Sequence, residues 1–250
     1  MKAAFHVEAL KLTHSLVGII ATCAMTVGTL ALLGGISAGI RAGNPELIAK
    51  AGPAASHDWD GLIAGATQIS AVSSILGFGI VLAWLFSREF TDGTITGLFA
   101  LPIRRGDIAL AKLAVFVLWV LATTSLVVFG VLLLGLCFGY GMPGSEASAA
   151  LGRLWLLMLF SAGITTPISW IATLTRSLLA AVSSTIAVVI IAQIGALSGA
   201  GDWVPLSAPA LWALSAGSAV TTLQLTLSLA IPGVFTALVY TSWSRLQLNR

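Results

Sequence analysis

The sequence predicts an all-α integral membrane protein with six transmembrane helices. Of its 250 residues 58% are hydrophobic and only 8% are charged, whereas soluble domains carry about 25% charged residues. Six apolar stretches have about the 20 residues that a helix needs to cross a bilayer. In lipid, a helix satisfies every backbone N–H and C=O within its own segment. Residues 1–250 are therefore expected to form a single transmembrane domain.

Lysine and arginine predict the orientation of the six spans. The expected spans are residues 15–38, 62–86, 113–138, 153–174, 178–200 and 220–241. An even number places both termini on one side, which then holds Lys2, Lys11, Arg88, Arg104, Arg105, Lys112, Arg176, Arg245 and Arg250. The other side holds Arg41, Lys50 and Arg153. Because the cytoplasmic loops of membrane proteins carry an excess of Lys and Arg, we expect an N-in/C-in topology.

Two segments outside the spans are expected to be short helices. In residues 1–14, Phe5, Ala9 and Leu12 share one helical face, with Glu8 and Lys11 elsewhere. This pattern favours an interfacial helix on the inner membrane surface, the alternative being a frayed tail. Residues 201–219 are too apolar for a free loop and too rich in proline for a span. They are expected to form a short external re-entrant helix before the last span.

Proline and glutamine are the notable residues inside the spans. Pro167 and Pro232 are expected to kink the fourth and sixth spans. Gln68, Gln193 and Gln224 are the candidates for a substrate path, although each amide can instead bond a neighbouring helix.

The sequence lacks the residues of several kinds of functional site. None of the four lysines follows a glycine, so the chain has no GxxxxGK[ST] phosphate loop. The histidines His6, His14 and His57 fall on opposite sides and predict no metal site. No GxSxG nucleophile motif is present. We therefore expect a chain that is not itself an enzyme, contains no metal site and depends on another chain for energy.

The loop between the second and third spans concentrates charge. Residues 88–112 hold Arg88, Glu89, Asp92, Arg104, Arg105, Asp107 and Lys112. Asp92 is expected to cap a short helix with an apolar stripe at Ile95, Leu98 and Phe99, which Pro102 ends. Asp107 is expected to cap the third span, with Lys112 reaching toward water at its base. A two-turn helix is unstable alone and needs a surface to lie on.

The segment "SREFTDGTITGLFALPIRRGDIALAK" resembles the signature of ABC-2-type permeases, the membrane subunits of bacterial ATP-binding-cassette exporters. The matching residues are Arg88, Glu89, Phe90, Gly93, Thr94, Leu98, Leu101, Pro102, Arg105 and Lys112. The N-terminal "VEALKLTHS" resembles the bacitracin- and lantibiotic-resistance branch, which carries an association with antibiotic resistance.

The resemblance implies how such a chain is driven. Residues 88–102 would be a coupling helix that sits on a separate cytoplasmic ATPase, present in two copies. The ATPase would carry ATP and Mg, with no cofactor in this chain. A second permease chain, expected to be identical, would complete a transporter in the bacterial cytoplasmic (inner) membrane. The residues expected to contact the ATPase are Arg88, Glu89, Phe90, Asp92, Gly93, Thr94, Leu98, Arg104 and Arg105.

Export of an amphipathic or apolar substrate, such as a peptide antibiotic, a drug or a lipid-like compound, is the leading hypothesis. An alternative is a channel or secondary-carrier subunit without an ATPase, which predicts charged groups at mid-membrane. A membrane enzyme would need a polar catalytic cluster. The loop itself has a simpler interpretation as a positively charged membrane anchor, which leaves Glu89 and the apolar stripe unexplained. With an ATPase partner, Glu89 is expected to pair with one of its basic residues.

Overall fold

The computed structural model describes residues 2–99 and 103–247. Leu101, Pro102 and Arg250, which entered the expectations above, lie outside these residues. Every regular element in the described ranges is helical, and six helices are long and apolar enough to cross a membrane. These six are Leu16–Arg41, Trp59–Thr91, Arg105–Cys137, Ser145–Thr175, Leu178–Leu197 and Thr222–Ser244. Each overlaps one of the predicted spans.

The second and third spans, α5 (Trp59–Thr91) and α7 (Arg105–Cys137), are longer than predicted. Each has 33 residues, or about 50 Å of helix at 1.5 Å per residue, against about 30 Å of hydrocarbon. Hydropathy marks only the apolar part of a helix, whereas the backbone hydrogen bonds continue into the polar ends. Both helices therefore extend beyond the apolar segment and carry the charged loop at their ends.

Three of the remaining spans are interrupted, each at an identifiable position. The first consists of α2 (Leu16–Cys23), the π-helical η1 (Ala24–Gly28) and α3 (Thr29–Arg41). The fourth divides into α8 (Ser145–Ile164) and α9 (Thr166–Thr175), with Pro167 in the first turn of α9. The sixth divides into α12 (Thr222–Leu227) and α13 (Ala230–Ser244), with Pro232 in the first turn of α13. The two predicted proline interruptions are therefore confirmed, since proline cannot donate the backbone hydrogen bond that would continue the preceding helix.

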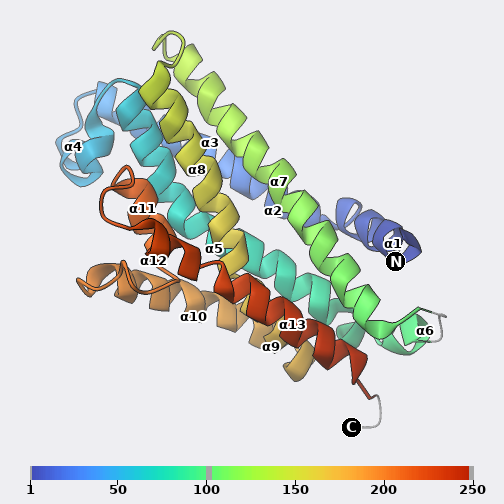
Figure 1. The fold of residues 1–250 in the computed structure, drawn as a ribbon. Coiled ribbons are helices and arrows are strands. Elements are labelled where there is room, and N and C mark those ends of the chain that lie inside the picture. The colour runs from blue at the N-terminus through green and yellow to red at the C-terminus, as the bar shows by residue number, and fades with distance from the viewer. Residues whose placement is uncertain (1, 100–102, 248–250) are drawn as a thin grey trace.

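Helix α5 lies at the centre of the bundle and packs against α7, α8, α9 and α10 (Leu178–Leu197). Its Phe78 is fully buried, with edge-on ring contacts to Phe116 and Trp119 of α7. Figure 1 shows α1 (Lys2–Thr13), α6 (Ile95–Phe99) and the last turns of α13 at one end of the bundle. The opposite end holds α4 (Pro45–Ala51), η2 (Gly52–Ala55) and the α7–α8 turn. The cytoplasmic assignment of the first end stays a prediction from charge.

Helix α1 packs against α7, and its buried residues are Ala4, Glu8 and Leu12. Phe5 and Ala9 are partly buried against the same core. The prediction that Glu8 lies off this face is wrong, because the helical spacing of four residues puts it between Ala4 and Leu12. Within 201–219, α11 (Ala208–Leu214) is a short helix packed against α5 and α8. Whether α1 lies on the membrane surface and whether 201–219 is re-entrant stay predictions.

Candidate functional site

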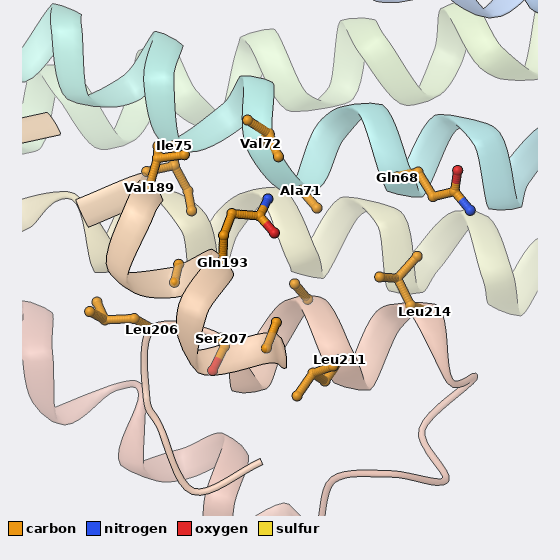
Figure 2. Close-up of a pocket in the computed structure, with 13 residues that line it drawn as sticks. Gln68, Ala71, Val72, Ile75, Val189, Gln193, Leu206, Ser207, Leu211 and Leu214 are labelled. Carbon is orange, nitrogen blue, oxygen red and sulfur yellow. The ribbon is translucent and has the colours of Figure 1, made fainter. Parts of the chain in front are cut away.

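A cavity inside the bundle contains two of the three glutamines considered for a substrate path. It has a volume of about 180 Å³ and lies between α5, α10 and α11, with Gln68 and Gln193 among its lining residues (Figure 2). Gln224 lies elsewhere: its side chain donates to Asp202 Oδ2 at 2.6 Å and accepts from the backbone N–H of Thr221 at 2.7 Å. The structure therefore places Gln68 and Gln193 in the lining of one cavity, whereas Gln224 belongs to the N-terminal cap of α12.

The charged loop begins later than the sequence predicts. Helix α5 continues to Thr91, and Asp92 is its C-cap, with a side chain 3.3 Å from Arg88 Nε. Gly93 follows in the left-handed region at φ +68°, which glycine adopts without strain. The first bond of α6 runs from Leu98 N–H to the Thr94 carbonyl. The prediction that Asp92 caps the short helix is therefore wrong: Asp92 ends one helix, and the next begins after a turn.

The third span also begins earlier than predicted. Helix α7 starts at Arg105 with Arg104 at the N-cap position, so Asp107 lies in its first turn and is not its cap. There its carboxylate still complements the positive end of the helix dipole. Arg104 is exposed, whereas Arg105 donates to the carbonyl of Leu246, which lies near the C-terminus.

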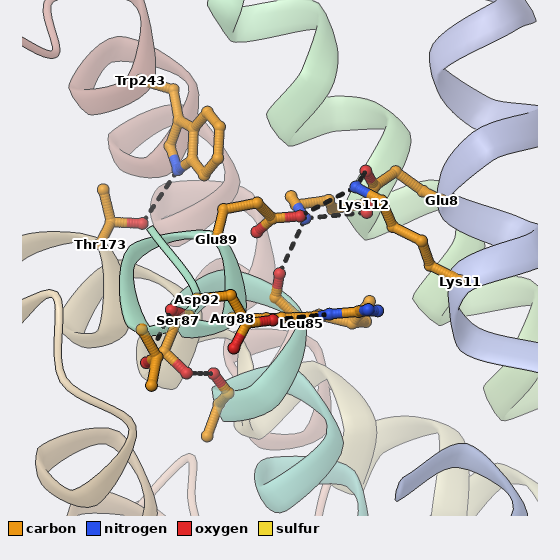
Figure 3. A network of polar contacts seen from close by, with 12 residues as sticks. Glu8, Lys11, Leu85, Ser87, Arg88, Glu89, Asp92, Lys112, Thr173 and Trp243 are labelled. Carbon is orange, nitrogen blue, oxygen red and sulfur yellow. Dashed lines mark hydrogen bonds and ion pairs between the residues drawn. The ribbon is translucent and has the colours of Figure 1, made fainter. Parts of the chain in front are cut away.

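Four charged side chains from α1, α5 and α7 form a network at this end of the bundle (Figure 3). Lys112 Nζ lies 2.8 Å from Glu8 Oε2 and 2.7 Å from Glu89 Oε1, and it donates to the Leu85 carbonyl at 2.8 Å. Lys11 Nζ completes the network at 2.6 Å from Glu8 Oε1 and 3.0 Å from Glu89 Oε1. Each carboxylate thus bridges both ammonium groups, and the four charges cancel.

Three members of this network are almost fully buried. Lys112 and Glu8 are each 1% exposed and Glu89 is 3% exposed. The prediction that Lys112 reaches toward water is therefore wrong, because the two carboxylates and a carbonyl hold its ammonium inside the protein. Burial opposes the charge of Lys11, but its hydrogen bond to Glu8 and the nearby Glu89 carboxylate raise its pKa above the ordinary value. Lys11 therefore stays charged at neutral pH.

Phe90 and Trp243 pack beside the network. Trp243 is fully buried and donates from Nε1 to Thr173 Oγ1 at 3.0 Å. Lys112 Nζ lies over its ring, 5.9 Å from the centroid. Phe90 makes an edge-on contact with Trp243, the ring centroids being 6.3 Å apart, and the Arg176 guanidinium lies 5.7 Å from the centroid of the Phe90 ring. Phe90 therefore joins α5 to α9 and α13 within the chain. This packing does not favour a role for the Phe90 side chain in a partner's groove.

A surface groove of about 310 Å³ lies between α1, the end of α5 and α6. Its lining includes five of the predicted partner-binding residues: Arg88, Glu89, Asp92, Thr94 and Leu98. Glu89 contributes Oε1 to the network, whereas its Oε2 is buried without a hydrogen-bond partner among the described residues. Such an atom normally has a partner, since an unsatisfied buried acceptor is costly. The groove thus combines apolar and charged side chains and borders the buried Glu89 carboxylate.

The sequence pattern identified part of this site. It singled out Arg88, Glu89 and the short helix but not Glu8, and it gave Lys11 and Lys112 other roles. The spacing of Glu8 and Lys11, three residues apart on a helix, signals a local ion pair. Nothing in the sequence signals that this pair also binds Glu89 and Lys112, which are 78 to 104 positions away in the chain.

Comparison with known proteins gives two matches. A family model described as "ABC-2 family transporter protein" matches residues 4–194, more than half of the chain. The bacitracin transport permease protein BCRB of Bacillus licheniformis is 29% identical over 59 residues. That similarity covers 24% of this chain and 28% of the relative's length.

Proposed function

Because this chain belongs to the ABC-2 family of transporter proteins, we propose that it is the permease subunit of an ABC exporter, driven by a separate cytoplasmic ATPase. The groove beside α6 is the proposed docking site. Two copies of the ATPase would act on two permease chains, the second identical to this one. Small residues on α10, such as Ala180, Ser184 and Ala187, allow close approach of the two copies.

The observation that carries the proposal is this groove, because five of the residues expected to contact the ATPase line it. A segment of the ATPase that enters the groove would lie against Arg88 and Glu89 at the end of α5. Within the chain, Glu89 Oε1 already bonds Lys112 of α7 and Lys11 of α1. A displacement of the ATPase would then move three helices together, because the ionic contacts join them.

The proposed cargo is amphipathic or apolar, such as a peptide antibiotic, a drug or a lipid-like compound. The cavity with Gln68 and Gln193 offers two amides among mainly aliphatic side chains. The Bacillus relative is a bacitracin transport permease, which supports a peptide antibiotic as one such cargo. The alternative of a channel or secondary carrier has less support, since the buried charges of the described residues gather at one end of the bundle and not at mid-membrane.

Filling the groove tests the proposal without breaking the ion pairs. A Cβ at Gly97 meets no atom within 4 Å, so Gly97→Trp places an indole in the groove at little cost to folding. We expect Gly97→Trp to abolish co-purification of the ATPase from native membranes, with the permease still inserted. Native mass spectrometry of the unmodified complex should give two permeases and two ATPases.

Gly35→Trp is the matched control, because Gly35 is exposed on α3 and its Cβ is equally unobstructed. It should retain the ATPase. If Gly97→Trp retains the ATPase as well, the groove is not the docking site. If the unmodified permease transports without any nucleotide-binding subunit, the channel or carrier alternative holds.

A further inference from the structure

A second cavity lies at the opposite end of the bundle from the charged groove. Its volume is about 420 Å³ and its walls come from α5, α8 and the α11 segment. On α5 the lining residues are Asp60, Ile63, Ala64, Thr67 and Gln68. This spacing of three and four residues defines one continuous stripe of the helix. The cavity therefore runs along α5 from a charged residue in its first turn to an amide two turns deeper.

Two opposite charges line this cavity, and neither has a partner among the residues that the structure describes. Arg153 of α8 is partly buried and Asp60 is exposed. Across the described ranges, neither side chain forms an ion pair or hydrogen bond, in contrast to the four members of the buried network. Asp58, two residues before Asp60, is also engaged, with its carboxylate on Ser56 Oγ and the Gly61 N–H. Asp60 and Arg153 are thus available to a ligand.

The remaining walls are largely apolar and adjoin the inner cavity. Ala150, Ala213 and Leu214 complete the lining with small or aliphatic side chains. Gln68 and Leu214 also line the cavity that contains Gln193. A molecule with a charged head and an apolar body would therefore find its charged contacts at the outer cavity and aliphatic contacts toward the bundle interior.

We propose that the outer cavity binds the zwitterionic head of an amphiphile, with Arg153 contacting its acid group and Asp60 its ammonium group. The two side chains cancel in charge, so a ligand of a single sign would meet one attraction and one repulsion. A zwitterion meets two attractions and leaves neither side chain unpaired. This inference rests on the proposed function in taking the ligand to be cargo, and it narrows that cargo from any amphipathic compound to one bearing both charges.

Direct binding tests the proposal without the ATPase. The purified permease in detergent is titrated with lysophosphatidylethanolamine, which is zwitterionic, and with lysophosphatidylglycerol, which is anionic, and bound molecules are counted by native mass spectrometry. We expect preferential binding of the zwitterion. Arg153→Gln should weaken it about tenfold or more, as expected for loss of a hydrogen bond to a charged group. Asp60→Asn should remove the preference over the anionic lipid.

Controls separate the cavity from general surface charge. Lys50→Gln removes an exposed cation at the same end of the bundle and should change neither affinity. Arg153→Lys keeps the charge and should retain most of the binding, which guards against misfolding of the glutamine variant. The exchange Asp60→Arg with Arg153→Asp should restore the preference for a zwitterion, because both charges are still present.

A further arm distinguishes the source of the zwitterion. A short lipopeptide with one free amine and one free carboxylate should displace lysophosphatidylethanolamine if the site takes cargo peptides, and its failure to compete assigns the site to lipid headgroups. Equal binding of both lysolipids, unaffected by Arg153→Gln, would overturn the proposal. The proposed function would be unaffected by that result, because ATPase co-purification is measured separately at the other end of the bundle.

Discussion

At the scale of single residues, Lys112 holds the most consequential contacts. Its ammonium meets two carboxylates and a carbonyl while only 1% of the residue is exposed. Lys112→Met keeps the length of the side chain but leaves Glu8 and Glu89 with Lys11 alone. We expect a loss of about 3–5 kcal/mol in the free energy of unfolding, the range for removing one partner of a buried ion pair. Thermal or denaturant unfolding in detergent measures it.

The double variant Lys112→Met with Glu89→Gln distinguishes the loss of the ion pair from the change in side-chain shape. It removes one charge of each sign, so it should be less destabilised than the sum of the single variants. Lys50→Met, at an exposed lysine, should stay within about 0.5 kcal/mol of the unmodified protein. Strict additivity of the two network substitutions would show that these charges do not interact.

Residue types near the loop could be predicted from the sequence, but their partners could not. Glu89 is singled out because it lies beside Arg88, where the second span leaves the membrane, and the expected partner is a basic residue of the ATPase. Its Oε1 instead bonds lysines from two other helices, so Glu89 also contributes to folding. Such a contact depends on how α1 folds back on α7, and hydropathy carries no information about that packing.

At the scale of elements, the corner between α1 and α2 determines where Glu8 and Lys11 lie. Ser15 caps α2 by accepting from the Gly18 N–H, and its hydroxyl donates to the Leu12 carbonyl. A Cβ at Gly18 would collide with that same carbonyl oxygen. Glycine at this position therefore permits the close approach that turns α1 onto α7.

Gly18→Ala should loosen α1 from the bundle. We expect a loss of about 1–3 kcal/mol, the cost of adding a methyl group where a backbone atom cannot yield. Trypsin cleavage after Lys11 should accelerate, because α1 then leaves its site more often. Gly28→Ala, where a Cβ meets nothing within 4 Å, should cleave at the unmodified rate. Unchanged cleavage in Gly18→Ala would show that the corner is not tight.

Element identity was more predictable than element ends. The short helix after α5 was expected from the stripe at Ile95 and Leu98, and α6 occupies that position. Its start was misplaced because Asp92 suits the end of one helix as well as the start of another: here Gly93 turns the chain left-handed after it. The two breaks near Pro167 and Pro232 were predictable because proline acts through the backbone alone. The π-helical turn Ala24–Gly28 has no such local signal.

At the scale of the whole molecule, apolar length and charge distribution suffice to predict six candidate spans. They do not predict which span lies at the centre. Helix α5 is the central span. One end of it lines the outer cavity, and the other end lines the groove beside α6. The two glutamines of the inner cavity, on α5 and α10, likewise come together only through packing of helices far apart in the chain.

The neutrality of the network formed by Glu8, Lys11, Glu89 and Lys112 has an electrical consequence. Moving one net elementary charge across the membrane potential costs about 2.3 kcal/mol per 100 mV. Because the four charges cancel, a shift of the network along the membrane normal does no work against that potential. ATP hydrolysis by the reconstituted transporter should therefore proceed at the same rate with or without a potassium diffusion potential. Glu8→Gln leaves one positive charge in excess, and in that variant the rate should become voltage-dependent.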